Sequence, residues 1–258
     1  MSPVDVVRHP DAEALAEAVA ARIITTLVER IATADHANIC LTGGGIGIAV
    51  LAAVAANPGC HSVDWGRVDV WWGDERYLPE GHVDRNETAA RAALLNRVPV
   101  DERRVHPIAG PWASGSDVES AAAAYAAELA AAARPQDHAG VPSMDILLLG
   151  IGPDAHVASL FPEQPALHDE RSVAAVRGAP KPPPVRVTLT LPTLNAARET
   201  WILASGAGKA GAVRMALSDS AGPFQVPAAG VRGRERTLFL IDEGAASKLP
   251  AGMGRPGA

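Results

Sequence analysis

The feature that most constrains the fold is a strongly apolar run, MDILLL at residues 144–149, which leads directly into the glycine-rich segment GIGPDAH at 150–156. A strand this apolar offers no face to water, so it is typical of a central strand in a parallel sheet that is covered on both faces. In such sheets, ligands bind beyond the carboxyl ends of the strands. The run therefore predicts a buried parallel strand whose carboxyl end lies next to a ligand site.

Strand patterns and helix patterns alternate along the rest of the chain. Amphipathic or alanine-rich stretches predict helices at 12–31, 46–56, 86–95, 117–134 and 209–217. Short apolar runs predict strands at 38–42, 68–72, 173–176, 185–190, 200–205 and 237–241. This alternation predicts an α/β, Rossmann-like fold with a mostly parallel central sheet and helices on both faces. We expect one domain over residues 1–250, a stiff proline-rich surface loop at 178–184 and a disordered tail at 251–258.

Charge and composition exclude several kinds of partner. With 23 Lys and Arg against 29 Asp and Glu, the formal net charge is −6 and there is no broad basic region, so we expect no nucleic-acid partner. No segment approaches about 18 uninterrupted apolar residues and the N-terminus lacks the apolar core of a signal peptide, so we expect neither membrane spanning nor secretion. Cys40 and Cys60 lack the spacing of a disulfide framework, which predicts reduced thiols and a cytoplasmic location.

The first distinctive loop is TGGGIG at 42–47, between a predicted strand and a predicted helix. Backbone N–H groups around Gly43, Gly44 and Gly45 could approach a phosphate closely, because no Cβ atom intervenes. The spacing matches neither GxGxxG nor a Walker A motif. A phosphate loop and a plain tight turn are therefore equal alternatives for this segment.

Charged residues follow or open other predicted strands. Lys209 and Arg186 could complement a phosphate dianion, although each taken alone is more often a solvated surface charge. Asp74 and Arg76, in the segment GDER at 73–76, could act on a ligand, or they could belong to a structural ion pair with a helix cap.

His156 is the most distinctive single residue, because it alone among eight histidines follows the most apolar strand through a glycine-rich turn. A neutral imidazole at the carboxyl edge of a sheet can take a proton from water at neutral pH. The alternative is a hydrogen-bonded histidine one layer behind a site. No HxxxH or HExxH spacing indicates zinc, so we predict no required metal, and the absence of a GxSxG elbow disfavours a serine acyl-enzyme.

Taken together, the motifs resemble the 6-phosphogluconolactonase family, whose relatives are the glucosamine-6-phosphate deaminases. The resemblance rests on seven blocks that recur in order: LTGGG (41–45), WGDER (72–76), DRN (84–86), LLLGIGPDAHVASLFP (147–162), RVTLT (186–190), GK (208–209) and VPA (226–228). The ending SLFP at 159–162 is similar to the lactonases rather than to the deaminases. The chain departs from the family where TGGGIG replaces the usual SGGSTP or SGGTTP, and where Ala155 replaces glycine.

This resemblance implies hydrolysis of 6-phospho-D-glucono-1,5-lactone to 6-phospho-D-gluconate, the second step of the oxidative pentose phosphate pathway, without a cofactor. It implies that His156 activates water, that Arg76 stabilises charge on the substrate or the tetrahedral intermediate, and that Asp74 orients the imidazole or a sugar hydroxyl. The residues expected to hold the 6-phosphate are Gly43, Gly44, Gly45, Arg186 and Lys209.

The expected partner is a phosphorylated sugar lactone, bound by a monomer or a weak homodimer. Two alternatives stay open. One is a deaminase or isomerase of amino-sugar phosphates in which Asp74 moves a proton between C1 and C2. The other is a sugar-phosphate-binding module without catalytic activity.

Overall fold

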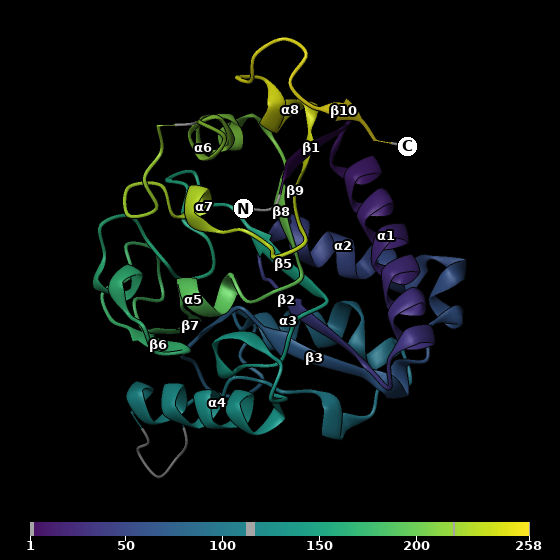
Figure 1. Cartoon of the computed structure of the whole chain (residues 1–258), viewed down its shortest axis with the longest axis vertical. Helices are drawn as coiled ribbons and strands as arrows, with labels where there is room; N and C mark the ends of the chain where they lie inside the picture. The colour runs from purple at the N-terminus through teal and green to yellow at the C-terminus, as the bar shows by residue number, and fades with distance from the viewer. Residues whose placement is uncertain (1–2, 112–116, 219, 258) are drawn as a thin grey trace.

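In the computed structural model, which describes residues 3–111, 117–218 and 220–257, seven of the described strands form a central sheet (Figure 1). The strand order is β10-β1-β9-β8-β5-β2-β3, and each neighbouring pair is parallel. Their bounds are β1 (Val4–His9), β2 (Ala37–Leu41), β3 (Val68–Trp72), β5 (Ile146–Gly150), β8 (Glu199–Ala204), β9 (Arg236–Asp242) and β10 (Arg255–Pro256). The predicted α/β architecture with a parallel sheet is confirmed.

Helices cover both faces of this sheet, as predicted: Figure 1 shows α1 and α2 on one side and α5, α6 and α7 on the other. Their bounds are α1 (Ala12–Thr33), α2 (Gly45–Ala56), α3 (Asn86–Ala93), α4 (Val118–Ala132), α5 (Leu191–Leu194), α6 (Ala210–Ala216), α7 (Pro227–Gly230) and α8 (Glu243–Ala246). Helix α1 begins where Asp11 accepts a hydrogen bond from Ala14 N, at 2.9 Å. Within the described ranges, no helix has the length and apolar character needed to cross a membrane.

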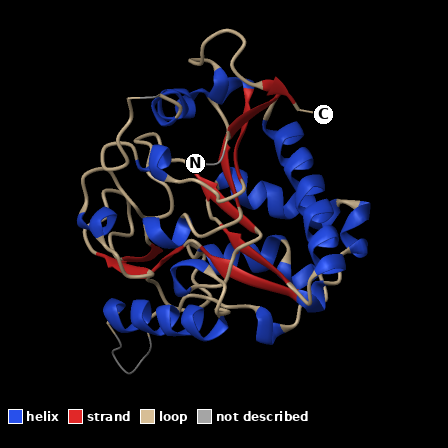
Figure 2. Cartoon of the chain, in the orientation of Figure 1, coloured by secondary structure: helices blue, strands red, loops and turns tan. Residues whose placement is uncertain are grey.

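A second, smaller sheet differs from the prediction. Strands β4 (Asp74–Arg76), β7 (Arg186–Leu189) and β6 (Val173–Val176) pair antiparallel in that order, apart from the central sheet (Figure 2). The sequence patterns predict strands at 173–176 and 185–190 within one mostly parallel sheet, and a loop at 73–76. The connection between β6 and β7 contains no helix, so it cannot make the crossover that a parallel pair needs, and an antiparallel pair results.

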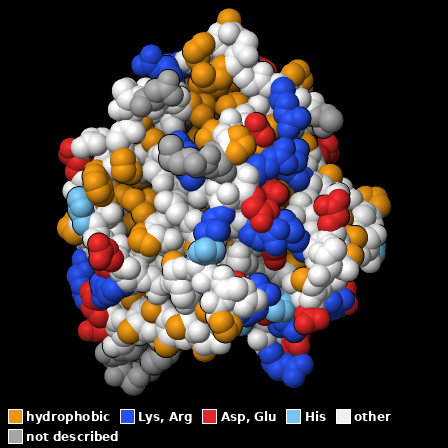
Figure 3. All heavy atoms as spheres, in the orientation of Figure 1, with side chains coloured by type: hydrophobic (Ala, Val, Ile, Leu, Met, Phe, Trp, Pro, Cys, Tyr) orange, Lys and Arg blue, Asp and Glu red, His pale blue; other side chains and the backbone are white. Residues whose placement is uncertain are grey.

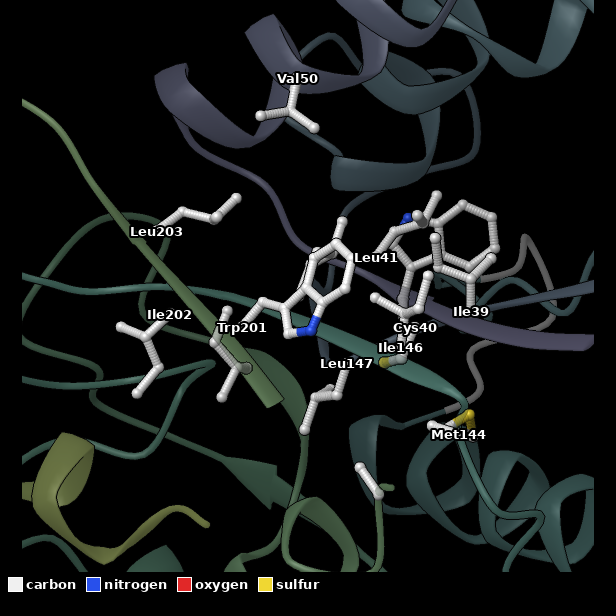
Figure 4. Packing of buried hydrophobic residues seen from close by; sticks show 14 of the residues in the cluster. Ile39, Cys40, Leu41, Val50, Met144, Ile146, Leu147, Trp201, Ile202 and Leu203 are labelled. Carbon is white, nitrogen blue, oxygen red and sulfur yellow. The ribbon is translucent and has the colours of Figure 1, made fainter. Parts of the chain in front are cut away.

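The core is centred on the middle strands of the large sheet. Trp201 of β8 is fully buried and pairs in register with Leu148 of β5. Figure 4 shows its indole beside Leu41 of β2, with Val50 of α2 above it in that view. Burial of one large apolar side chain stabilises the fold by roughly 1.5–3 kcal/mol. This packing fixes β2, β5 and β8 relative to one another, and with them the loops at their ends.

The two cysteines are both free and buried. Burial raises the pKa of the Cys40 thiol far above its ordinary value, and the nearby Asp74 carboxylate raises it further. Neither thiol is paired in a disulfide, and their reduced state stays a prediction.

The C-terminal segment differs from the expected disordered tail. Residues 255–256 form β10, which pairs with β1, and Gly257 N donates a 2.7 Å hydrogen bond to Arg8 O. Gly257 lies so close to the His9 ring that a Cβ atom there would come within 2.2 Å of His9 Cε1. A strand of two residues carries no hydrophobic alternation, so sequence periodicity gives no sign of it.

Candidate active site

Four neighbouring strands of the central sheet, β8, β5, β2 and β3, carry the predicted functional loops at their carboxyl ends. Because the strands are parallel and adjacent, these loops open on one edge of the sheet. They surround a pocket of about 610 Å³. The pocket is lined by all eight residues predicted from the sequence: Gly43, Gly44, Gly45, Asp74, Arg76, His156, Arg186 and Lys209.

The glycine loop leads from β2 into the N-terminus of α2. Gly44 has φ +83°, a left-handed conformation that favours glycine, and its carbonyl accepts the first α2 hydrogen bond, from Ile48 N at 3.0 Å. A Cβ atom on Gly43 would lie 1.9 Å from Asn86 Oδ1, so only glycine fits there. The N–H groups of the first α2 turn have no partner within the helix, and Gly45 and Ile46 line the pocket. This end of α2 suits an anion.

His156 follows β5 in a tight turn that also contains Asp154. Ala155 N donates to Gly152 O and Gly152 N donates to His156 O, both at 2.9 Å, while Ala155 adopts φ +64°. The fully buried Ala155 therefore holds the left-handed conformation that the family's usual glycine would adopt without strain. A Cβ atom on Gly152 would lie 2.0 Å from His156 Nδ1, so a glycine at 152 leaves the room that the imidazole occupies.

Asp154 contacts the imidazole directly. Its Oδ1 lies 2.5 Å from His156 Nδ1, which directs Nε2 to serve as the free nitrogen, and the ring packs on Phe161 at 4.5 Å between centroids. Burial lowers the pKa of His156 below its ordinary value, although the hydrogen bond and charge of Asp154 oppose this. The histidine is therefore mostly neutral at neutral pH and able to accept a proton.

Asp74 has a different environment from the one predicted. Its Oδ2 accepts a 2.6 Å hydrogen bond from Ser159 Oγ, and Asn86 Nδ2 donates to its Oδ1 at 3.2 Å. The expectation that Asp74 orients the imidazole is wrong, because Asp154 bonds to Nδ1 instead. Asp74 lines the pocket, so a contact with a sugar hydroxyl stays a prediction.

Arg76 and Glu75 have separate roles although they are adjacent in the sequence. Arg76 lines the pocket and donates from Nη1 to Asp84 O at 2.6 Å, while its buried Nε has no partner in the part of the chain that the structure describes. Glu75 is buried and accepts from the backbone N–H groups of Asn86 at 2.7 Å and Glu87 at 2.9 Å. Glu75 therefore caps α3, which is the structural alternative considered for this motif, and leaves Arg76 for the pocket.

The cations of the pocket are not equally free. Lys209 Nζ donates to Ile151 O at 2.7 Å, and burial together with the charge of Lys181 lowers its pKa. Arg186 lies 3.9 Å from Asp74 Oδ2 through Nη1, but its Nε and Nη2 donate to carbonyls of residues 181–183. Most hydrogen-bond donors of Arg186 are therefore used in bonds to backbone carbonyls and are not free for a ligand in the pocket.

Four residues that the sequence analysis did not assign to the site also contribute to it: Asn86, Asp154, Ser159 and Lys181. Asp154 and Ser159 lie within the same motif as His156, so their proximity in sequence was an available signal. Lys181 lies in the proline-rich loop at 178–184, outside the His156 motif, and its sequence position does not indicate a place in the pocket.

No group of three or more His, Cys, Asp or Glu side chains that could hold a metal ion occurs within residues 3–111, 117–218 and 220–257. On the face seen in Figure 3, acidic and basic side chains are interspersed, and a histidine lies beside basic side chains near the centre.

Comparison with known proteins places these features in a family. The family model for glucosamine-6-phosphate isomerases/6-phosphogluconolactonase matches residues 10–240. The chain is 57% identical over 252 residues to a 6-phosphogluconolactonase of Streptomyces coelicolor, covering 96% of this chain and 95% of the relative. It is 47% identical over 244 residues to a 6-phosphogluconolactonase of Mycobacterium tuberculosis, covering 94% and 97% of the two chains.

Solved structures share the fold as well. The structure is similar to that of 6-phosphogluconolactonase from Trypanosoma brucei, with a TM-score of 0.84 and 27% sequence identity, over 97% of this chain and 100% of that chain.

Proposed function

Because the chain belongs to the glucosamine-6-phosphate isomerase/6-phosphogluconolactonase family, we propose that it hydrolyses 6-phospho-D-glucono-1,5-lactone to 6-phospho-D-gluconate, in the oxidative pentose phosphate pathway. Relatives with the lactonase name match it over nearly their whole length. The observation that carries the proposal is that His156, which is hydrogen-bonded to Asp154, lines one pocket together with a set of anion-binding groups.

In the proposed reaction, His156 acts as the general base. Its Nδ1–H donates to Asp154, and Nε2 takes a proton from a water molecule as the water oxygen attacks the lactone carbonyl at C1. When the tetrahedral intermediate collapses, the bond between C1 and the ring oxygen breaks, and the proton on Nε2 passes to that oxygen. The product acid then loses a proton to solvent, so each turnover releases acid.

Negative charge develops on the carbonyl oxygen during the attack. Arg76 is suited to stabilise it, because this residue lines the pocket and its guanidinium always carries a positive charge. Asp154 stabilises the imidazolium that forms at the same moment, because its carboxylate lies 2.5 Å from Nδ1.

The 6-phosphate is held away from the reacting carbon. We assign it to the N–H groups at the start of α2, in the glycine loop, and to Lys209. Arg186 contributes through its remaining Nη1 rather than through the bidentate contact that its residue type suggests, because its Nε and Nη2 bond to loop carbonyls. Binding at this distant group fixes the ring so that C1 faces His156.

A continuous acid-release assay on freshly generated 6-phosphogluconolactone tests the proposal, with spontaneous hydrolysis subtracted. The wild-type protein should accelerate acid release, His156→Gln should reduce kcat by at least about 100-fold, and His61→Gln, at an exposed position, should not. Full activity of His156→Gln would contradict the role of His156. Ammonia release from glucosamine 6-phosphate without lactone hydrolysis would instead favour the deaminase alternative, and binding without either activity would favour the non-catalytic one.

A further inference from the structure

Lys181 enters the pocket from a loop outside the four strand ends. It opens the segment Lys-Pro-Pro-Pro that precedes β7, and it lines the pocket. Its Nζ lies 3.7 Å from Asp154 Oδ1, the same oxygen that bonds to His156 Nδ1 at 2.5 Å. The lysine ammonium and the imidazole are therefore at most about 6 Å apart, close enough for their charges to interact.

The backbone of this loop is held by one buried side chain. Proline has no N–H group, so the segment offers few backbone donors with which to fasten itself to the neighbouring strands. Arg186 supplies donors instead: Nε bonds to Pro183 O at 3.1 Å, and Nη2 bonds to Lys181 O at 3.0 Å and Pro182 O at 3.2 Å. Because Arg186 is only 5% exposed, these bonds are protected from water, and Lys181 starts from a fixed point at the pocket wall.

We propose that Lys181 is a positioning residue for the His156–Asp154 pair: its ammonium group shares the Asp154 carboxylate with the imidazole and so favours the neutral, proton-accepting form of His156. This inference rests on the general-base role of His156 proposed above. It also gives Arg186 a defined task, which is to hold the loop that presents Lys181.

The charges around His156 act in both directions. Burial favours the neutral imidazole most, the Asp154 carboxylate opposes this, the Lys181 ammonium favours the neutral form, and Asp74 on β4 opposes it. The Phe161 ring that packs on the imidazole carries no charge, and the Arg186 guanidinium lies 5.7 Å from that ring. Lys181 is therefore the cation whose removal should allow the Asp154 and Asp74 carboxylates to raise the pKa of His156.

Lys209 faces the same group of charges from the loop after β8. Its charge interacts with both Lys181 and Asp154, and its Nζ is bonded to Ile151 O. Because this hydrogen bond does not involve Lys181, we expect Lys209 to keep its position when Lys181 is replaced, so that only one of the two cations is lost.

The test compares Lys181→Met with Lys181→Arg and with Lys248→Met, the same substitution at an exposed lysine away from the pocket. Two quantities are measured for each protein: the acid limb of the kcat/KM profile between pH 5.5 and 8.5, and the pKa of the His156 imidazole by NMR titration without substrate. In Lys181→Met both should move up by about 0.5–1 pH unit, since about 6 Å in partly screened surroundings gives a shift of this size. The value of kcat/KM should then fall more at pH 6 than at pH 8, by up to about sixfold.

Lys181→Arg should keep the wild-type profile, because it keeps the charge, and Lys248→Met should do the same. An unchanged His156 pKa in Lys181→Met together with a raised KM would overturn the inference and make Lys181 a substrate contact only. An equal shift in Lys248→Met would also overturn it, because the effect would then be one of overall charge. If the wild-type protein fails to hydrolyse the lactone, the proposed function fails, whereas the NMR titration still decides the electrostatic role of Lys181.

Discussion

Replacing Asp154 by asparagine separates the charge of this residue from its shape. The amide is nearly the same size as the carboxylate and its oxygen can still accept the hydrogen from His156 Nδ1, so the turn at 152–156 should keep its fold. What is lost is the negative charge that, in the proposed mechanism, stabilises the imidazolium formed when His156 takes a proton from water. The expected result is a lower kcat with a correctly folded protein.

The size of the effect follows from the hydrogen bond. A bond to a charged group contributes about 1.5–3 kcal/mol and one between neutral groups about 0.5–1.5 kcal/mol, so the exchange costs about 1.5 kcal/mol. Water screens part of this because the Asp154 side chain is 36% exposed, which leaves about 1 kcal/mol. We therefore expect kcat to fall at least about fivefold. The decrease should be larger if the asparagine turns its NH₂ group toward Nδ1, because that group cannot accept the Nδ1 hydrogen.

The pH profile should move in a defined direction. Burial lowers the pKa of His156 and the Asp154 carboxylate opposes that effect, so removing the carboxylate lets the pKa fall further. The acid limb of kcat/KM should then move to lower pH, opposite to the shift expected for Lys181→Met. The acid-release assay from pH 5.5 to 8.5 measures both quantities, with the exposed Asp64→Asn as the control. An unchanged kcat, or a limb displaced to higher pH, would refute the role given to Asp154.

Two further predictions concern stability. Ser159→Ala removes a buried 2.6 Å hydrogen bond to Asp74 and should lower the free energy of unfolding by about 1.5–3 kcal/mol in urea denaturation, and a loss below about 0.5 kcal/mol would mean that Asp74 finds another partner. Burial lowers the pKa of His106, but its hydrogen bonds to Asp69 and Glu128 outweigh this and raise the pKa above the ordinary value. His106 should therefore stabilise the fold fully below about pH 6.5 and lose that contribution as pH rises through its folded-state pKa. Wild-type stability should fall over that range relative to His106→Gln, and parallel curves for the two proteins would argue against it.

Much of the central fold could be predicted because it follows from local patterns. The strand predicted at 68–72 matches β3 at Val68–Trp72. A short apolar run of five residues that ends at a glycine is typical of a buried strand. The pocket could be predicted too, because parallel topology brings the ends of neighbouring strands to one edge whatever their separation in sequence. Seven of the eight proposed site residues follow the ends of these strands and line one pocket, and Arg186 reaches the same pocket from β7 of the antiparallel sheet.

The pairing of individual side chains could not be predicted in this way. Both Asp74 and Asp154 follow strands, and only the left-handed turn at Ala155 decides that Asp154 bonds to the imidazole. The role of Arg186 was also hidden, because a guanidinium that satisfies carbonyls of its own loop has the same sequence signature as one that awaits a phosphate. Side-chain direction depends on tertiary contacts, which a single sequence does not contain.

The loops at the two ends of the parallel strands form two opposite rims of the molecule. We expect these rims to differ in how well they tolerate an insertion. The rim at the carboxyl ends of the strands holds the pocket, whereas residues 134–140, which precede β5, lie on the other rim and are mostly exposed. A peptide tag or a fluorescent domain inserted there would be separated from the substrate by the length of β5. We therefore expect an insertion at residues 134–140 to leave the pocket unchanged.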